Sequence, residues 1–159
     1  LSLIDSEVKN VSASGVAVVS DQIDIANARI EFENGAVANV TASRISQKKM
    51  RKMRMFQRDA YLSLDFNSGT TEVYRLVNPE MMPPNPFINF GEMGIGEKKK
   101  LVVYEQPEVK EINALKLELE YFINSIQHDK KPIVSGKDGL KALRVAEMII
   151  KKIDETRIS

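Results

Sequence analysis

The sequence contains no cysteine, and it has a single histidine, His128. Without cysteine there can be no disulfide framework, no thiolate nucleophile and no zinc site with sulfur ligands. The formal net charge is only +1, so no global field attracts nucleic acid or an anionic membrane. Apolar runs are far shorter than the roughly 20 residues that cross a bilayer, and no signal-peptide pattern opens the chain. We therefore expect a soluble, cytoplasmic protein with few means of catalysis of its own.

The chain has 159 residues, of which 43% are apolar, and this predicts a single domain over residues 1–159 with a core of its own. From residue 8 to 77, short stretches rich in Val, Ile, Thr and aromatic residues alternate with turn residues, which is typical of an antiparallel sheet. Besides the hairpin discussed next, the candidate strands are 8–19, 53–57, 61–65, 71–77 and 100–104.

The clearest strand is 25–32, where apolar and polar residues alternate, and it runs into Asn34-Gly35. Asn-Gly is the strongest short hairpin signal, because a type I′ turn needs positive φ at both central residues. A two-residue turn at this point pairs Ile30 with Asn39 and fixes every other pair. Both faces of the hairpin are then mixed in polarity, whereas a sheet with one wet face sorts its residues. We therefore expect both faces to be covered, one by helices and the other by a further surface.

Residues 78–97 hold four prolines and three glycines interleaved with Met, Phe and Ile. So long a loop is unusual inside a compact domain, and its apolar content favours a cover that packs somewhere.

After Pro107 the apolar spacing becomes helical. One amphipathic helix is expected from Ile112 to His128, and a second begins at a capping box, Ser135 with Asp138, and continues to about Ile153. The predicted fold is thus α+β: a largely antiparallel open sheet of about six strands with two C-terminal helices packed on one face.

Few residues point to chemistry. Gly91, Gly94 and Gly96 have the spacing of a phosphate loop read backwards, but no strand-to-helix context accompanies them, so we interpret them as a plain loop. His128 comes at a predicted helix end, where the helix dipole favours an imidazolium. The sequence predicts no metal site.

One charged cluster stands out. Six cations and no acid occur within segment 48–58. They fit a solvated strand edge, an anion site for a nucleotide sugar or cofactor phosphate, or a module that binds RNA or an acidic partner. Sheets that bind RNA also need exposed aromatic rings, and this segment offers only Phe56.

Residues 24–35, DIANARIEFENG, and 37–44, VANVTASR, resemble the C-terminal domain of the Gfo/Idh/MocA oxidoreductases, relatives of glucose-fructose oxidoreductase and inositol dehydrogenase. Residues 120–126 and 135–143 are similar to the closing helical pair of that family. The resemblance extends over essentially the whole chain.

The resemblance implies a substrate-binding and dimerisation domain of an enzyme that uses NAD or NADP to oxidise a sugar, polyol or nucleotide sugar. An N-terminal Rossmann domain, absent from this sequence, would hold the cofactor and the catalytic lysine, so we expect no catalytic or cofactor-binding residue here and no activity of the chain alone. The expected partners are this Rossmann domain, a small sugar substrate and a second copy that meets the sheet face, with no nucleic acid and no membrane. The candidate substrate-binding residues are Arg44, Lys49 and Arg51.

Overall fold

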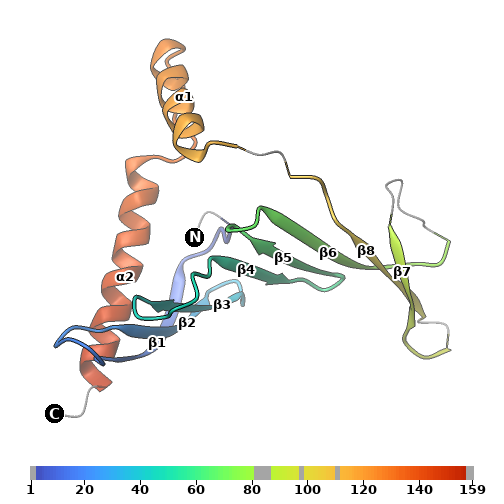
Figure 1. The fold of residues 1–159 in the computed structure, drawn as a ribbon, viewed down its shortest axis with the longest axis horizontal. Coiled ribbons are helices and arrows are strands. Elements are labelled where there is room, and N and C mark those ends of the chain that lie inside the picture. Colours follow the sequence, from blue (N-terminus) through green and yellow to red (C-terminus); the bar gives the residue numbers. More distant parts are fainter. Residues whose placement is uncertain (1–2, 81–86, 97–98, 110–111, 157–159) are drawn as a thin grey trace. The chain divides into compact units, whose positions relative to one another are not determined.

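The computed structural model describes residues 3–80, 87–96, 99–109 and 112–156 (Figure 1). Within them the order is eight strands followed by two helices: β1 Val8–Val16, β2 Ile25–Phe32, β3 Val37–Ser43, β4 Lys52–Phe56, β5 Ala60–Asp65, β6 Thr70–Val77, β7 Ile88–Met93, β8 Lys100–Glu105, α1 Ala114–Gln127 and α2 Gly136–Thr156. They form two compact units. The first unit is Leu1–Gln47 with Ala114–Ser159, and the second is Lys48–Asn113.

The predicted α+β class and the antiparallel pairing are confirmed, but the count of about six strands in one sheet is wrong. The described strands form a three-stranded sheet, β1-β2-β3, and a five-stranded sheet, β4-β5-β6-β8-β7. One strand was missed because β7 lies inside the predicted loop 78–97, where glycine and proline masked it. Its pairing with β8 is interrupted between Asn89 and Glu92, and Gly91 in between takes a φ of 97°, which suits glycine. Residues 81–86 of that predicted loop lie outside the described part of the chain.

The predicted hairpin between β2 and β3 exists, but its register differs by one residue from the predicted one. Ile30 pairs with Ala38 instead of Asn39. The amide of Gly35 donates to the carbonyl of Phe32, and the amide of Phe32 donates to the carbonyl of Ala36, which makes a three-residue loop. Gly35 has a φ of 85° and Asn34 does not have a positive φ, so the type I′ turn is excluded.

The shift of one residue sorts the two faces of the three-stranded sheet at their central positions. The inner face is apolar, with Val11, Ala13, Ala28, Ile30 and Ala38 in adjacent positions. The outer face carries only polar residues at the corresponding central positions, namely Ser12, Ser14, Asn27, Arg29, Asn39 and Thr41. The expectation that both faces are covered rested on the mixed pattern, and for this sheet that pattern does not exist.

Helix α2 covers the inner face of the three-stranded sheet and lies beside β1 (Figure 1). Val145 and Ile149 pack against a buried cluster of Val11, Ile30 and Phe32. Ile153 is 1% exposed, and it approaches β1 so closely that a Cβ on Gly15 would lie 2.9 Å from its Cγ2 atom. The close contact explains why a glycine interrupts the otherwise side-chain-bearing strand β1.

The predicted capping box at the start of α2 is confirmed. The carboxylate of Asp138 accepts hydrogen bonds from the amide and the hydroxyl of Ser135, at 2.8 and 2.6 Å. The amide of Asp138 donates in return to the Ser135 hydroxyl oxygen, at 3.4 Å. These contacts hold the pKa of Asp138 below its usual range, with the Ser135 hydroxyl as the main cause.

The prediction that both helices pack on the sheet holds for α2 but is wrong for α1. No residue of α1 is buried, and its apolar residues are exposed except for Leu117, which is half-buried. The amphipathic period of α1 was read correctly, but period alone does not say what a helix packs against.

Candidate functional site

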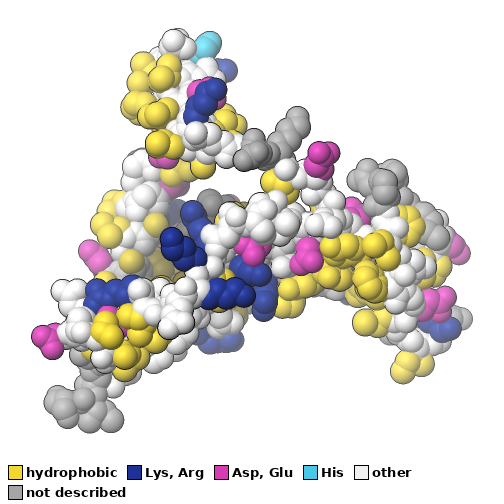
Figure 2. All heavy atoms as spheres, viewed as in Figure 1, with side chains coloured by type: hydrophobic (Ala, Val, Ile, Leu, Met, Phe, Trp, Pro, Cys, Tyr) yellow, Lys and Arg dark blue, Asp and Glu magenta, His cyan; other side chains and the backbone are white. Residues whose placement is uncertain are grey.

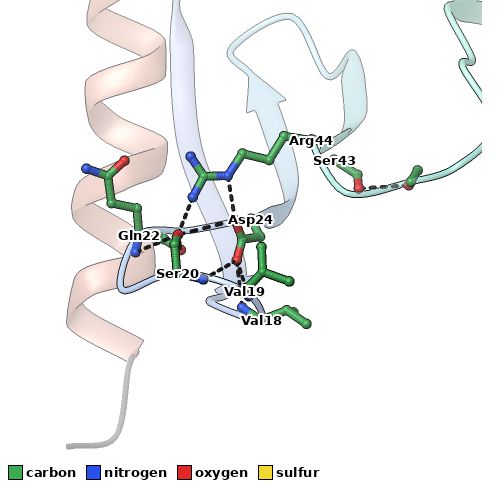
Figure 3. A network of polar contacts seen from close by, with 8 residues as sticks. Val18, Val19, Ser20, Gln22, Asp24, Ser43 and Arg44 are labelled. Atoms are coloured by element: carbon green, nitrogen blue, oxygen red, sulfur yellow. Dashed lines mark hydrogen bonds and ion pairs between the residues drawn. The ribbon is translucent and has the colours of Figure 1, made fainter.

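Asp24 is the one buried charged residue among the described residues, and it organises the loop between β1 and β2 (Figure 3). Its Oδ2 atom accepts the amides of Val18 and Val19 at 2.7 and 2.8 Å. The guanidinium of Arg44 lies on the other carboxylate oxygen, with Nε 2.5 Å from Oδ1. The amides of Val19 and Val18, followed by Arg44, hold the pKa of Asp24 well below its usual range.

Arg44, a predicted substrate-binding residue, is therefore committed to an internal contact. Besides Asp24, its guanidinium donates to the hydroxyl oxygen of Ser20, and its backbone amide donates to the carbonyl of Asp24 at 3.0 Å. Arg44 thus ties the end of β3 to the loop before β2, while about half of its side chain stays exposed at 49%. We assign its first role to positioning this loop.

The low pKa of Asp24 predicts acid sensitivity. A carboxylate whose pKa is depressed on folding stabilises the fold above its unfolded pKa of about 4, and that contribution is lost as pH falls below it. We expect Asp24→Asn to lower the Tm at pH 7 by roughly 5–10 °C. The difference in Tm between parent and variant should shrink as pH is lowered from 7 to 3.

Thermal unfolding followed by circular dichroism across this pH range measures the effect. Asp21→Asn, which removes an exposed acid from the same loop, is the control and should change the Tm at pH 7 by no more than about 1 °C. A Tm difference between parent and Asp24→Asn that stays constant from pH 7 to 3 would contradict the assignment.

The basic segment 48–58 contains β4, which lies at one edge of the five-stranded sheet. Lys52 Nζ contacts Asp65 Oδ2 at 2.9 Å, and this bond is the main cause of the lowered pKa of Asp65. The guanidinium carbon of Arg51 lies 5.6 Å from the ring centre of Phe66. Lys49 is exposed, and its carbonyl accepts the side-chain amide of Asn67 at 3.0 Å. Cations on an edge strand also guard it against pairing with other chains.

Lys49 and Arg51 thus belong to the second unit, near the start of β4, while Arg44 belongs to the first.

Five aromatic side chains form a row across all five strands of the second sheet. Phe56 on β4 stacks on Tyr61 at 4.8 Å between ring centres, and Tyr61 lies 5.5 Å from Tyr74. Tyr74 lies 4.9 Å from Tyr104 on β8, and Phe90 on β7 lies 5.8 Å from Tyr104. We call these five residues the aromatic row.

The aromatic row is exposed at both ends. Phe56 is 79% exposed and Phe90 61% exposed, whereas the three tyrosines between them are half-buried. Tyr104 has a raised pKa, caused first by desolvation and then by the charge of Glu72. On the opposite face of the sheet Val73, Leu101 and Val103 are buried. From the sequence, Phe56 was the only one of these five rings that we considered for binding. The other four rings come from separate strands, and only the strand register brings them beside Phe56.

The other features considered in the sequence are His128, a possible metal site and a possible membrane-spanning helix. His128 follows α1, and its Nδ1 atom lies 3.0 Å from the carbonyl oxygen of Asn124, as expected of a residue at a helix end. In the described part of the chain no three His, Asp or Glu residues are grouped so as to hold a metal ion. Neither described helix has the length and apolar character required to cross a membrane.

No protein-family model matches the chain. UDP-N-acetylglucosamine 3-dehydrogenase of Acidithiobacillus ferrooxidans is 32% identical to it over 146 residues, which are 92% of this chain and 42% of that protein. A solved structure of that dehydrogenase superposes on 98% of this chain, with a TM-score of 0.80 and 30% identity, and the match covers 45% of the solved chain. The sequence and fold of the chain are thus similar to those of part of this dehydrogenase, which agrees with the predicted resemblance to the Gfo/Idh/MocA oxidoreductases.

The chain therefore spans less than half the length of the relative it matches. More distant structures share the fold alone. They include an NAD-binding protein from Listeria innocua, with 17% identity and a TM-score of 0.65 over 98% of this chain and 46% of that chain. Another is an aldose-aldose oxidoreductase from Caulobacter crescentus, with 22% identity and a TM-score of 0.55 over 96% of this chain and 41% of that chain.

Among the described residues, Gly91, Gly94 and Gly96 do not form a dinucleotide-binding turn. In the dinucleotide fingerprint the pyrophosphate lies on glycine-rich backbone amides at the start of a helix. Gly91 lies in a strand, and the next described element after Gly94 and Gly96 is strand β8. The first turn of α2 carries the Asp138 carboxylate, which repels a phosphate.

Proposed function

We propose that the chain is the substrate-binding and dimerisation domain of an oxidoreductase that uses NAD or NADP on a sugar, polyol or nucleotide sugar. The observation that carries the proposal is the shared sequence and fold, over nearly the whole chain, with a dehydrogenase of a nucleotide sugar. In this proposal the cofactor and the catalytic groups come from a Rossmann domain that precedes this chain, and the chain alone is inactive. We also propose a cytoplasmic location.

The contribution of this domain to the reaction is positioning. Hydride transfer needs the substrate carbon held against the nicotinamide, and anchoring a remote part of the substrate supplies that geometry. Lys49 and Arg51 are exposed cations that suit an anionic group such as the diphosphate of a nucleotide sugar.

The experiment that tests this role uses the intact two-domain enzyme with Lys49→Ala and Arg51→Ala together. We expect the KM for the sugar substrate to rise roughly tenfold, and kcat to change by less than about twofold, because the lost contacts bind ground state and transition state alike. Steady-state kinetics measure both. Lys9→Ala with Lys130→Ala removes the same charge from exposed positions of the first unit and should leave both constants unchanged. An unchanged KM in the Lys49, Arg51 variant would remove these residues from the site.

The proposed dimer contact is the aromatic row. A two-fold contact uses the same patch on both copies, and aromatic residues are enriched in the cores of such interfaces. Five strands carry the row over about 19 Å at the usual strand spacing. A dimer contact through a sheet face was expected from the sequence. We propose the five-stranded sheet for this contact, because the outer face of the three-stranded sheet is polar at its central positions and suits water.

A second candidate function is binding of single-stranded RNA, and the aromatic row is the observation that favours it. Lys52 and Arg54 alternate with Met53 and Met55 along β4, so they share a face with Phe56. Aromatic rings beside cations are the usual surface for stacked bases. Titration with labelled oligonucleotides separates the two functions, because RNA binding predicts submicromolar affinity that falls steeply with salt, whereas the oxidoreductase domain predicts neither.

A further inference from the structure

Helix α1 carries an apolar stripe that nothing in the described residues buries. We define the α1 stripe as the four residues at helical spacing on one side of the helix, Leu115, Leu119, Phe122 and Ile126. Their exposed fractions lie between 53% and 66%. Figure 2 shows hydrophobic side chains gathered along this helix. An exposed apolar surface of this kind marks an interaction site more often than a solvated face.

The length of α1 supports the same conclusion. A helix of 14 residues is marginal in water by itself, and most helical stability in proteins comes from packing an apolar face. Since no α1 residue is buried, the packing that stabilises this helix must come from a surface beyond the described contacts.

Helix α2 has apolar residues on two sides. Val145, Ile149 and Ile153 face the three-stranded sheet. Leu140, Leu143 and Ile150 are 47%, 57% and 52% exposed, and helical spacing places them away from that face. A helix with apolar residues on both sides is typical of a layer that is covered from both sides.

We propose that the α1 stripe, together with the outward side of α2, is the surface on which the dinucleotide-binding half of the same polypeptide docks. This inference rests on the proposed function. The matched dehydrogenase has more than half of its length outside the region shared with this chain, and a domain of that size needs an interdomain contact of about 600–1,500 Å². A second copy is assigned to the aromatic row of the other unit, which leaves the helical surface for the covalently linked half.

The test compares hydrogen exchange of α1 in the 159-residue chain and in the longer two-domain protein. We expect amides of residues 114–127 to exchange at least about tenfold more slowly in the two-domain protein. The variant Leu119→Glu with Ile126→Glu should remove that protection. The matched control, Asn124→Glu with Gln127→Glu, adds the same charge at exposed positions off the stripe and should keep it.

The 159-residue chain provides the folding control. Because the stripe is exposed there, both double variants should keep a Tm within about 2 °C of the parent chain. Equal exchange of α1 in the short chain and the two-domain protein would overturn the proposal. Protection that rises with the concentration of the short chain would also overturn it, since a second copy would then cover the stripe.

Titration of the two-domain protein with NAD and NADP separates this inference from the proposed function. If α1 is protected and no nicotinamide binds, the docking surface stands and the proposed cofactor chemistry fails. If nicotinamide binds and α1 is unprotected, the docking surface fails and the proposed function stands.

Discussion

The double substitution Phe56→Glu, Phe90→Glu should convert the proposed homodimer into a monomer. Both rings lie at the exposed ends of the aromatic row, so their replacement removes apolar contact area and places like charges across a two-fold contact. Loss of an aromatic hot spot costs about 2 kcal/mol or more, so the loss of both rings should raise the dimer dissociation constant roughly a thousandfold or more. Sedimentation equilibrium over a range of concentrations measures this constant.

The control for this experiment uses the other sheet. Ser12→Glu with Asn39→Glu introduces the same charges on the polar outer face of the three-stranded sheet, where both positions are exposed. This variant should sediment as the parent does. If the control variant were a monomer and the Phe56, Phe90 variant a dimer, the contact would lie on the three-stranded sheet and the proposal would be wrong. Parent protein that is monomeric at high micromolar concentration would contradict dimerisation by this domain.

Ile153→Ala should destabilise the first unit strongly, and Ile150→Ala should not. Ile153 is 1% exposed against strand β1, so its truncation leaves a cavity and costs about 3 kcal/mol, or a fall in Tm of roughly 6–12 °C. Ile150, three residues earlier on the same helix, is 52% exposed, and its truncation should cost less than about 1 kcal/mol.

Thermal and urea unfolding of the two single variants measure this difference. Comparable losses at both positions would mean that the outward side of α2 is covered within the 159-residue chain. That result would contradict both the assignment of the α2 faces and the docking surface built on it.

The hairpin shows how far sequence reasoning reached. The strand 25–32 and a tight turn at Asn34-Gly35 were predicted correctly, because alternation and glycine are local signals. The register was not, because Asn-Gly occurs in both two-residue and three-residue loops, and the sequence does not show whether Asn34 takes a positive φ. Because the predicted register was shifted by one residue, apolar and polar side chains appeared mixed on both faces, although the central positions of the two faces are separated in the structure.

The aromatic row was only partly within reach of the sequence. The strands that hold Tyr61 and Tyr74 were both predicted, and their antiparallel pairing places these two residues opposite each other. Tyr104 required the non-sequential pairing of β6 with β8, which no local pattern gives. Phe90 lay in a stretch whose prolines and glycines suggested a loop.

The candidate site was less predictable than the fold. Arg44 was selected because it follows a long strand. In the structure its guanidinium binds Asp24, twenty residues earlier. No sequence pattern predicted that Asp24 is buried. Lys49 and Arg51 were selected from charge density alone, and a cluster of cations does not distinguish an anion site from a protected strand edge. The resemblance to a family supplied the functional prediction, since few residue types with catalytic chemistry occur in this chain.

The central claim is that this domain supports a nicotinamide-dependent reaction without holding the nicotinamide. Isothermal titration of the 159-residue chain and of the two-domain protein with NAD and NADP tests it most directly. The account predicts no heat of binding for the short chain and saturable binding of one cofactor per subunit for the two-domain protein. Saturable binding by the short chain, or none by the two-domain protein, would contradict it.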